Sequence, residues 1–204
     1  GTATDWYARF LKVNGKVQGT TSGGLASMGN GVPYALAAKF AEPDKPVVAM
    51  VGDGAMQMIG NNGLITAAHY WREWSDPRLV ILVLNNRDLN QVTWEQRVME
   101  GDPKYQSSQA LPDFDYDRYA EMLGLRGLRL DDPDQVVAVL EDALNADRPV
   151  VINAVVDPNV PPLPTHLEMD QVKGYLSSIL KGDPEAGPQI RQSVKAMAAK
   201  YLKR

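Results

Sequence analysis

The stretch Pro46-Val47-Val48-Ala49-Met50-Val51 is a continuous apolar run that ends abruptly in Gly52-Asp53-Gly54. A second run, 79–84, has the same character and ends in Asn85-Asn86, and a third covers 149–156. Apolar runs without polar alternation are typical of parallel strands that are covered on both faces. These segments decide the fold class, because parallel strands need a long crossover, usually a helix, between them.

Helical patterns lie between and after these strands. They cover residues 32–40, 64–74, 116–123 and 134–144. The alternation predicts an α/β protein, a three-layer α/β/α sandwich with a mainly parallel sheet. After the stiff stretch Pro161-Pro162-Leu163-Pro164, two more helical patterns follow at 169–180 and 188–202. We therefore predict a binding domain over residues 1–163 and a helical C-terminal extension over residues 164–204.

Composition excludes several classes of function. The 204 residues carry a net charge of −4, which argues against nucleic acid as a partner. The absence of cysteine excludes disulfides and thiolate metal sites. No apolar run is long enough to cross a bilayer, and the first residues form no secretory signal. We expect a cytoplasmic location. We also expect that the chain is cut from a longer polypeptide, because it does not start with methionine.

The first polar motif, Gly52-Asp53-Gly54-Ala55, directly follows a buried strand. In parallel α/β sheets, ligands bind beyond the carboxyl ends of the strands. Glycines allow close backbone approach to a ligand, and the N–H groups of a following helix can face an anion. A carboxylate beside a phosphate site needs a cation between them, and Mg²⁺ prefers such oxygen ligands.

The second polar motif, Asn85-Asn86-Arg87-Asp88, ends the next strand along the chain. Asparagines are poor strand formers, and their amide oxygens are neutral ligands for a metal. Either motif alone could be a plain turn, since Asn and Gly favour turns. Both motifs at consecutive strand ends favour a binding site.

A glycine-rich segment, Gly23-Gly24-Leu25-Ala26-Ser27-Met28-Gly29-Asn30-Gly31, leads into the first predicted helix. It is either a flexible loop or a tight loop pressed against a flat ligand. In the second case Met28 would be an apolar support, because methionine fills irregular gaps and packs well beside rings.

Together these motifs resemble the thiamine-diphosphate-dependent enzymes, in which Gly-Asp-Gly, a helix and a strand closing in Asn-Asn form the signature. The glycine-rich loop and the opening Gly1-Thr2-Ala3-Thr4-Asp5-Trp6 resemble the branch of quinone-dependent pyruvate oxidases and acetolactate synthases. The resemblance covers most of the chain. It implies the C-terminal, diphosphate-binding domain of such an enzyme.

The resemblance also implies roles for individual residues. Asp53 and Asn86 would bind Mg²⁺ through their side chains, and Asp88 through its backbone carbonyl. Contacts to thiamine diphosphate would come from the first loop, the glycine-rich loop and the first motif, namely from Thr2, Ala3, Ala26, Met28, Gly52, Gly54 and Ala55. Val92 and Glu95 would lie beside the reacting part of the cofactor as catalytic residues, although Glu95 could equally be a solvated helix residue.

The sequence departs from the family pattern at three points. Asp53 and Asn86 are 33 positions apart, more than is usual, and we place the extra residues in the connection 70–77. Asn90 stands where relatives often have glycine, which puts the turn after the metal site in doubt. The glutamate that protonates the cofactor's pyrimidine ring belongs to a separate pyrimidine-binding domain, and that domain and the middle domain are missing here.

The main hypothesis is part of an enzyme that decarboxylates and oxidises a 2-keto acid, pyruvate first, as a homo-oligomer. FAD would be bound mainly by the missing domains. One alternative is an acetolactate synthase-type carboligase, and another is a cofactor-binding module with no activity alone. A nucleotide-binding domain is weaker, because no Gly-x-Gly-x-x-Gly follows the first strand. The basic C-terminal helix could contact the inner face of a membrane or simply pack on its own subunit.

Overall fold

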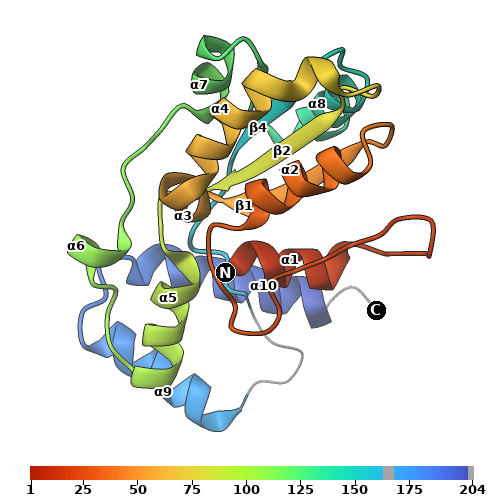
Figure 1. Ribbon diagram of the computed structural model, residues 1–204. Helices are drawn as coiled ribbons and strands as arrows, with labels where there is room; N and C mark the ends of the chain where they lie inside the picture. The colour runs from red at the N-terminus through yellow and green to blue at the C-terminus, as the bar shows by residue number, and fades with distance from the viewer. Residues whose placement is uncertain (163–167, 202–204) are drawn as a thin grey trace.

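The computed structural model describes residues 1–162 and 168–201, and its centre is a four-stranded parallel sheet (Figure 1). The strands lie in the order β1 (Val47–Gly52), β2 (Leu79–Asn85), β4 (Val150–Val155) and β3 (Arg126–Leu130). All neighbouring strands are parallel, so their carboxyl ends share one edge of the sheet. The predicted α/β class and parallel sheet are confirmed.

Helices cover both faces of the sheet. On one face, α2 (Gly31–Ala41), α4 (Asn61–Tyr70) and α7 (Tyr116–Met122) pack on alternate residues of the strands. On the other face, α8 (Val136–Leu144) packs over β2, β4 and β3. Opposite side chains of the two central strands, β2 and β4, therefore enter different cores, which explains why these strands are apolar without alternation.

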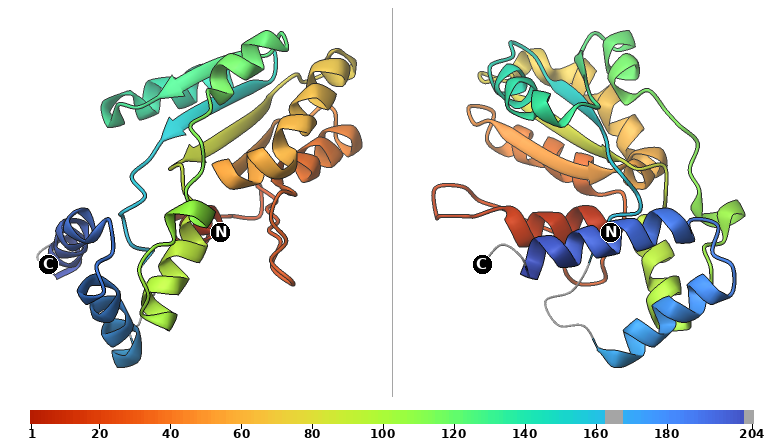
Figure 2. Two further views of the ribbon diagram at one scale, coloured as in Figure 1. Left: turned by 90° about the vertical axis from the view of Figure 1, so that its left-hand side faces the viewer. Right: turned by 180° about the vertical axis from the view of Figure 1, so that it is seen from behind.

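The remaining elements connect this sandwich or extend it. They are α1 (Thr2–Phe10), α3 (Asp53–Ala55), the π-helix η1 (Met56–Gly60), the 3₁₀ helices η2 (Trp71–Glu73) and η4 (Pro133–Gln135), α5 (Asn90–Glu95), the π-helix η3 (Gln96–Glu100), α6 (Gln106–Gln109), α9 (Met169–Leu180) and α10 (Ala186–Tyr201). Both views in Figure 2 show α5, α9 and α10 gathered beyond the carboxyl ends of the strands. No helix in residues 1–162 and 168–201 is long and apolar enough to span a membrane.

Three predictions about the elements need correction. The strand β3 was not expected, because its sequence Arg126-Gly127-Leu128-Arg129-Leu130 lacks an apolar run. The predicted helix at 64–74 is one part of a helical segment that begins already at Asp53 and ends at Tyr70. The last helix begins at Ala186 instead of 188, and its predicted end at 202 lies outside the described residues. The predicted domain boundary at 163/164 lies outside the described residues.

The connection after α4, where we placed the additional residues, is packed against the fold. Trp74 is buried, and its ring meets Phe40 of α2 at right angles. The buried Lys39 donates to the carbonyls of Pro43, Lys45 and Asp76 and so ties this connection to the one before β1. Burial lowers the pKa of Lys39, although Asp76 acts against the shift. These contacts hold the sheet's amino end, opposite the polar motifs.

Candidate cation and diphosphate site

Asp53 is the first residue after β1, and its buried carboxylate joins the ends of two strands. Its Oδ1 accepts the N–H of Gly54 at 2.8 Å. Its Oδ2 accepts the N–H groups of Asn86 and Arg87, at 3.0 and 2.5 Å, from the loop that follows β2. The two polar motifs of the sequence therefore meet at the carboxyl edge of the sheet, as predicted.

The electrostatic state of Asp53 is set mainly by burial. Burial raises the pKa of the Asp53 carboxyl above its ordinary value, and the three N–H donors only partly oppose this rise. The neighbouring carboxylate of Asp88 raises it further. A cation beside Asp53 would favour the charged form of this carboxyl.

Asn86 is buried at the start of the loop, and its side chain faces back over the loop. Its Oδ1 accepts the N–H of Asp88 at 3.0 Å. An amide oxygen has two lone pairs, so this hydrogen bond leaves one for a further partner. Between Asn86 and Asp88, Arg87 has a left-handed backbone with φ of +58°, which is uncommon for residues other than glycine. Such conformations cluster at ligand-binding sites.

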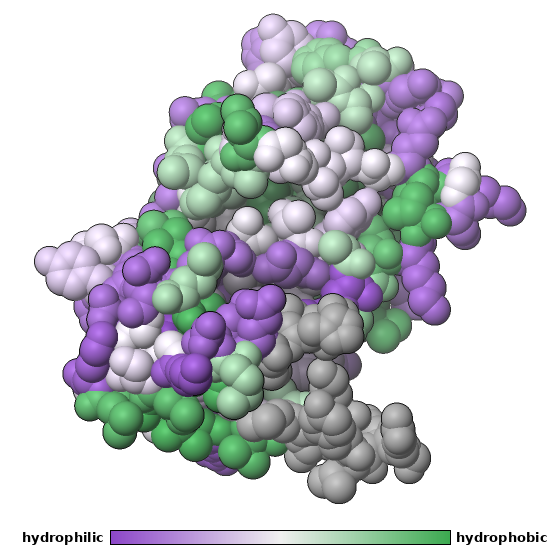
Figure 3. Space-filling model, turned by 90° about the horizontal axis from the view of Figure 1, so that it is seen from below, coloured by the Kyte–Doolittle hydropathy of each residue, from purple (hydrophilic) through white to green (hydrophobic). Residues whose placement is uncertain are grey.

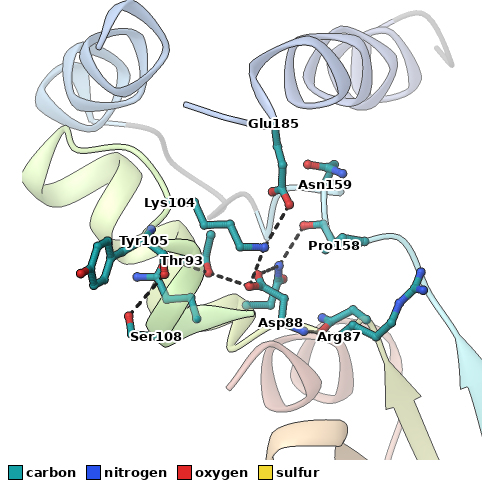
Figure 4. A network of polar contacts seen from close by, with 12 residues as sticks. Arg87, Asp88, Thr93, Lys104, Tyr105, Ser108, Pro158, Asn159 and Glu185 are labelled. Carbon is teal, nitrogen blue, oxygen red and sulfur yellow. Dashed lines mark hydrogen bonds and ion pairs between the residues drawn. The ribbon is translucent and has the colours of Figure 1, made fainter. Parts of the chain in front are cut away.

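The carboxylate of Asp88 is held by protein groups. Its Oδ1 lies 2.9 Å from Nζ of Lys104 and 3.0 Å from Oγ1 of Thr93, and its Oδ2 accepts Nδ2 of Asn90 at 3.0 Å (Figure 4). Asn90 also donates to the carbonyl of Pro158 at 2.8 Å. The turn after the motif is therefore stabilised by the Asn90 side chain.

Asn85 does not share this site. Its buried Nδ2 donates to Oδ1 of Asn153 on β4 at 3.1 Å, and Asn153 donates in turn to Asp117 of α7 at 2.9 Å. The Asn85 side chain therefore has a partner on the neighbouring strand, within the face covered by α7, because side chains alternate along a strand.

The glycine-rich loop approaches the first motif through Met28. A Cβ atom on Gly54 would lie 2.6 Å from Cε of Met28 and 2.9 Å from Cδ2 of Leu89. The absence of a side chain at Gly54 therefore lets the loop lie close to the start of the helix. Ala26 has a left-handed backbone with φ of +53°. Thr2 and Ala3 begin α1, which contacts β1 beyond its carboxyl end (Figure 1).

Val92 and Glu95 lie apart from the other candidates, one helical turn from each other on α5. Both are exposed, and Glu95 accepts a hydrogen bond from Gln91 at 2.9 Å. They line an open groove together with Gln96 and Met99. Both side chains are thus accessible to a ligand or a protein segment that lies over α5, and the structure does not connect them to Asp53.

Two residues that support the site gave no signal in the sequence. The hydroxyl of the buried Tyr116 donates to the carbonyl of Asp53 at 3.2 Å and accepts Nε2 of Gln57 at 3.0 Å. Burial and the nearby Asp53 carboxylate raise the pKa of Tyr116 to about 12, despite the opposing bond from Gln57, so the hydroxyl stays protonated. Lys104 is the second, and its partners lie far away along the chain.

These residues fit a divalent cation and an anionic phosphate group. One buried carboxylate, an amide oxygen and a loop carbonyl are the oxygen ligands that Mg²⁺ prefers. The first N–H groups of the helix that begins at Asp53 have no partner within the helix, which suits an anion. Within the described residues, no group of three or more His, Asp or Glu side chains could hold a metal, so the mixed set at Asp53 is the candidate.

Comparison with known proteins agrees with this geometry. Residues 1–154 match the family model of the C-terminal thiamine pyrophosphate binding domain of thiamine pyrophosphate enzymes. A putative thiamine pyrophosphate-containing protein of Bacillus subtilis, YdaP, is 32% identical over 97% of this chain. The mitochondrial acetolactate synthase catalytic subunit of Aspergillus candidus is 33% identical over 78% of it.

The same comparisons show how much of the relatives the chain represents. It spans 33% of the Bacillus protein and 22% of the Aspergillus protein. Among solved structures, a thiamine diphosphate-dependent 4-hydroxybenzoylformate decarboxylase of Rhodococcus jostii matches with a TM-score of 0.55 and 27% identity. That match covers 64% of this chain and 23% of the decarboxylase.

Proposed function

The chain belongs to the thiamine pyrophosphate enzyme family, as its C-terminal cofactor-binding domain, and on this premise we propose that it binds the cofactor's diphosphate through Mg²⁺. Asp53 and Asn86 act as side-chain ligands and Asp88 as a backbone ligand. The observation that carries the proposal is the buried Asp53 carboxylate, which receives N–H groups from the loop holding the other two residues.

The other candidates bind and orient the organic part of the cofactor. The backbone at Gly52, Gly54 and Ala55, where the strand passes into the helix, lies beside the diphosphate at the positive end of the helix. Thr2 and Ala3 approach the same end of the sheet from α1, while Ala26 and Met28 support the rings. When bound, thiamine diphosphate supplies the chemistry that releases CO₂ from a 2-keto acid, and the protein supplies orientation and electrostatics.

We propose a decarboxylating oxidase acting on a 2-keto acid, with pyruvate as the first substrate to test. The Bacillus relative aligns over 97% of the chain, whereas the Aspergillus acetolactate synthase aligns over 78%, so the C-terminal extension favours a protein unlike the synthases. Val92 and Glu95 face the open groove on α5, where a substrate and FAD held by other domains would approach.

An acetolactate synthase-type carboligase is the second candidate, because several relatives carry that name, including one from Methanococcus aeolicus at 33% identity. The full-length protein, given pyruvate, distinguishes the two. We expect bound flavin to be reduced during pyruvate turnover. Acetolactate formation without flavin reduction would instead establish the carboligase. The 204-residue chain alone serves as the control, and we expect it to turn over no pyruvate, because the pyrimidine-activating glutamate belongs to another domain.

Other parts of a longer, oligomeric protein are the expected partners of this chain. Figure 3 shows apolar side chains gathered over α9 on the face seen from below. Leu176 and Leu180 are 52% and 87% exposed on its outer side, and Met99 of η3 is 70% exposed. Apolar surface of this kind is typical of contact regions. It supports neighbouring domains or subunits as the partners of this face.

The ligand assignment is tested by Asp53→Ala in the full-length protein. Removal of the single carboxylate from the cation site should abolish Mg²⁺-dependent binding of thiamine diphosphate in a calorimetric titration. Asp53→Asn keeps the shape and should give the same loss. Asp44→Ala, an exposed aspartate before the same strand, is the matched control. Cofactor affinity that is unchanged in both Asp53 variants would refute the assignment.

A further inference from the structure

Lys104 is a buried lysine that belongs to none of the motifs of the sequence, yet it contacts the candidate cation loop. Its Nζ lies 2.9 Å from Oδ1 of Asp88 and 3.0 Å from Oε1 of Glu185, the residue just before α10 (Figure 4). Lys104 is therefore the cation between two carboxylates.

The far end of this arrangement is anchored by Arg97 of η3. Arg97 Nη2 donates to Glu185 at 2.7 Å and to Oδ1 of Asp183 at 3.1 Å, and its Nε donates to Oδ2 of Asp183 at 2.9 Å. Asp183 also accepts the backbone N–H of Lys104 at 2.9 Å and Nε2 of Gln189 at 2.6 Å. Alternating charges thus run without a gap from the candidate cation loop to the C-terminal extension.

The near end of the arrangement fixes where the Asp88 carboxylate lies. Lys104, Thr93 and Asn90 all approach Asp88 from α5 and the segment after it, and they engage both of its oxygens. The carboxylate is therefore turned to that side, although the backbone N–H of the same residue donates to the Asn86 side chain at 3.0 Å, in the candidate cation loop. Without Lys104, the buried Asp88 carboxylate would lose its neighbouring cation. A bound metal would then be the nearest cation to this carboxylate.

The number of carboxylates at a metal decides how well it attracts an anion. A divalent cation beside one carboxylate keeps about one positive charge for the diphosphate, and beside two carboxylates it keeps about none. We propose that Lys104 is a positioning residue that holds the Asp88 carboxylate away from the cation, so that the metal remains able to bind the diphosphate. Asp183 and Glu185 of the C-terminal extension keep Lys104 in place.

This inference rests on the proposed function but reaches beyond the family domain. The family model ends at residue 154, whereas Glu185 and Asp183 lie in the extension that follows. The extension therefore contributes to the cofactor site, and this site depends on residues of both predicted domains.

The test measures two affinities in the full-length protein by calorimetry, that of Mn²⁺ alone and that of thiamine diphosphate at saturating Mg²⁺. In Lys104→Met, the freed Asp88 carboxylate should strengthen Mn²⁺ binding and weaken thiamine diphosphate binding, the latter by about tenfold, as is common for partners of metal ligands. A purely structural role would weaken both affinities together. Addition of Asp88→Asn to Lys104→Met should restore thiamine diphosphate binding.

Lys181→Met is the matched control, because Lys181 forms an exposed ion pair of 2.6 Å with Asp102 between α9 and the segment after η3. It should leave both affinities unchanged. If circular dichroism shows that Lys104→Met does not fold, the double variant Lys104→Met/Glu185→Gln, which also removes the Glu185 carboxylate that Lys104→Met leaves without its lysine, decides in its place, with the same directions expected. Wild-type affinities in either folded variant, or no rescue by Asp88→Asn, would overturn the inference. A wild-type protein that binds no thiamine diphosphate would instead refute the proposed function.

Discussion

Asn85 and Asn86 are adjacent and chemically identical, yet their side chains have different partners. Asn85 is the last residue of β2 and extends its amide to Asn153 on the neighbouring strand. Asn86 has left the strand, and its amide turns back to the N–H of Asp88. The last step of the strand therefore separates a structural amide from a candidate ligand, and composition alone does not distinguish them.

Tyr116 shows how a residue outside the motifs can support the site. In Tyr116→Phe, the carbonyl of Asp53 keeps the backbone N–H of Met56 as a donor but loses the hydroxyl, and Gln57 keeps only the carbonyl of Pro112 as an acceptor. We expect a loss of about 0.5–1.5 kcal/mol in the free energy of unfolding, measured with urea. Tyr105→Phe, at an exposed tyrosine, is the control and should change stability little. Equal stability of both variants would contradict this role for Tyr116.

At the residue scale, the sequence predicted those parts of the site that lie at the ends of neighbouring strands. Asp53 and the loop from Asn86 to Asp88 meet as expected, because the ends of neighbouring parallel strands must lie together. The contact of Lys104 with Asp88 and Glu185 could not be predicted, since the three residues follow no spacing rule. The turn that follows the metal-site motif forms with asparagine at position 90, and the Asn90 amide stabilises it with two hydrogen bonds.

At the scale of elements, α9 and α10 are joined to η3 by close packing and by buried charge. A Cβ atom on Gly174 of α9 would lie 2.3 Å from the carbonyl oxygen of Val98, so the two helices approach through a position without a side chain. The Arg97–Asp183 ion pair next to this contact is wholly buried. A buried pair destabilises strongly when one partner is removed.

Asp183→Asn should therefore destabilise the protein by about 3–5 kcal/mol at neutral pH. Burial would raise the pKa of Asp183, but hydrogen bonds from Arg97 and from two backbone N–H groups outweigh it and lower this pKa below the ordinary 3.8. The stabilisation is thus complete above pH 3.8 and is lost as the pH falls through the lowered pKa.

Denaturant unfolding across a pH series checks this prediction. The difference between wild type and Asp183→Asn should be constant above that range and should shrink below it. Asp170→Asn, at an exposed residue of α9, should show little difference at any pH. A difference of the same size throughout the acid range would contradict the role of the ionised Asp183.

The elements themselves were predictable where a hydrophobic run or a helical period was strong. The central strands and the helices that flank them fall close to their expected positions. The edge strand β3 was not predicted, because Arg126 and Arg129 interrupt its apolar residues and its two leucines face only one core. A strand at the edge of a sheet contributes one buried row, and a short segment with one such row resembles a surface loop.

At the scale of the whole molecule, the polar site lies where three bodies of structure meet. The sheet supplies Asp53, α5 and the segment after it fix Asp88, and the C-terminal extension closes the array through Glu185. The helical patterns after the proline-rich stretch predicted two further helices, and α9 and α10 are present there. It could not indicate that this extension returns to the site, because long-range ion pairs leave no periodic trace in a sequence.

The π-helix η1, which comes after Asp53 within a single helical segment, bears on how such sequences are compared. A π turn accommodates one residue more than an α turn, so the helix can lengthen by one residue without displacing the next turns. Deletion of one residue from Met56–Gly60 would therefore convert the π turn into an α turn and leave Asp53, Leu64 and Ala67 in their present orientation. Sequence distance between the two motifs is best counted in turns, because the π turn holds one residue more than an α turn of the same helix.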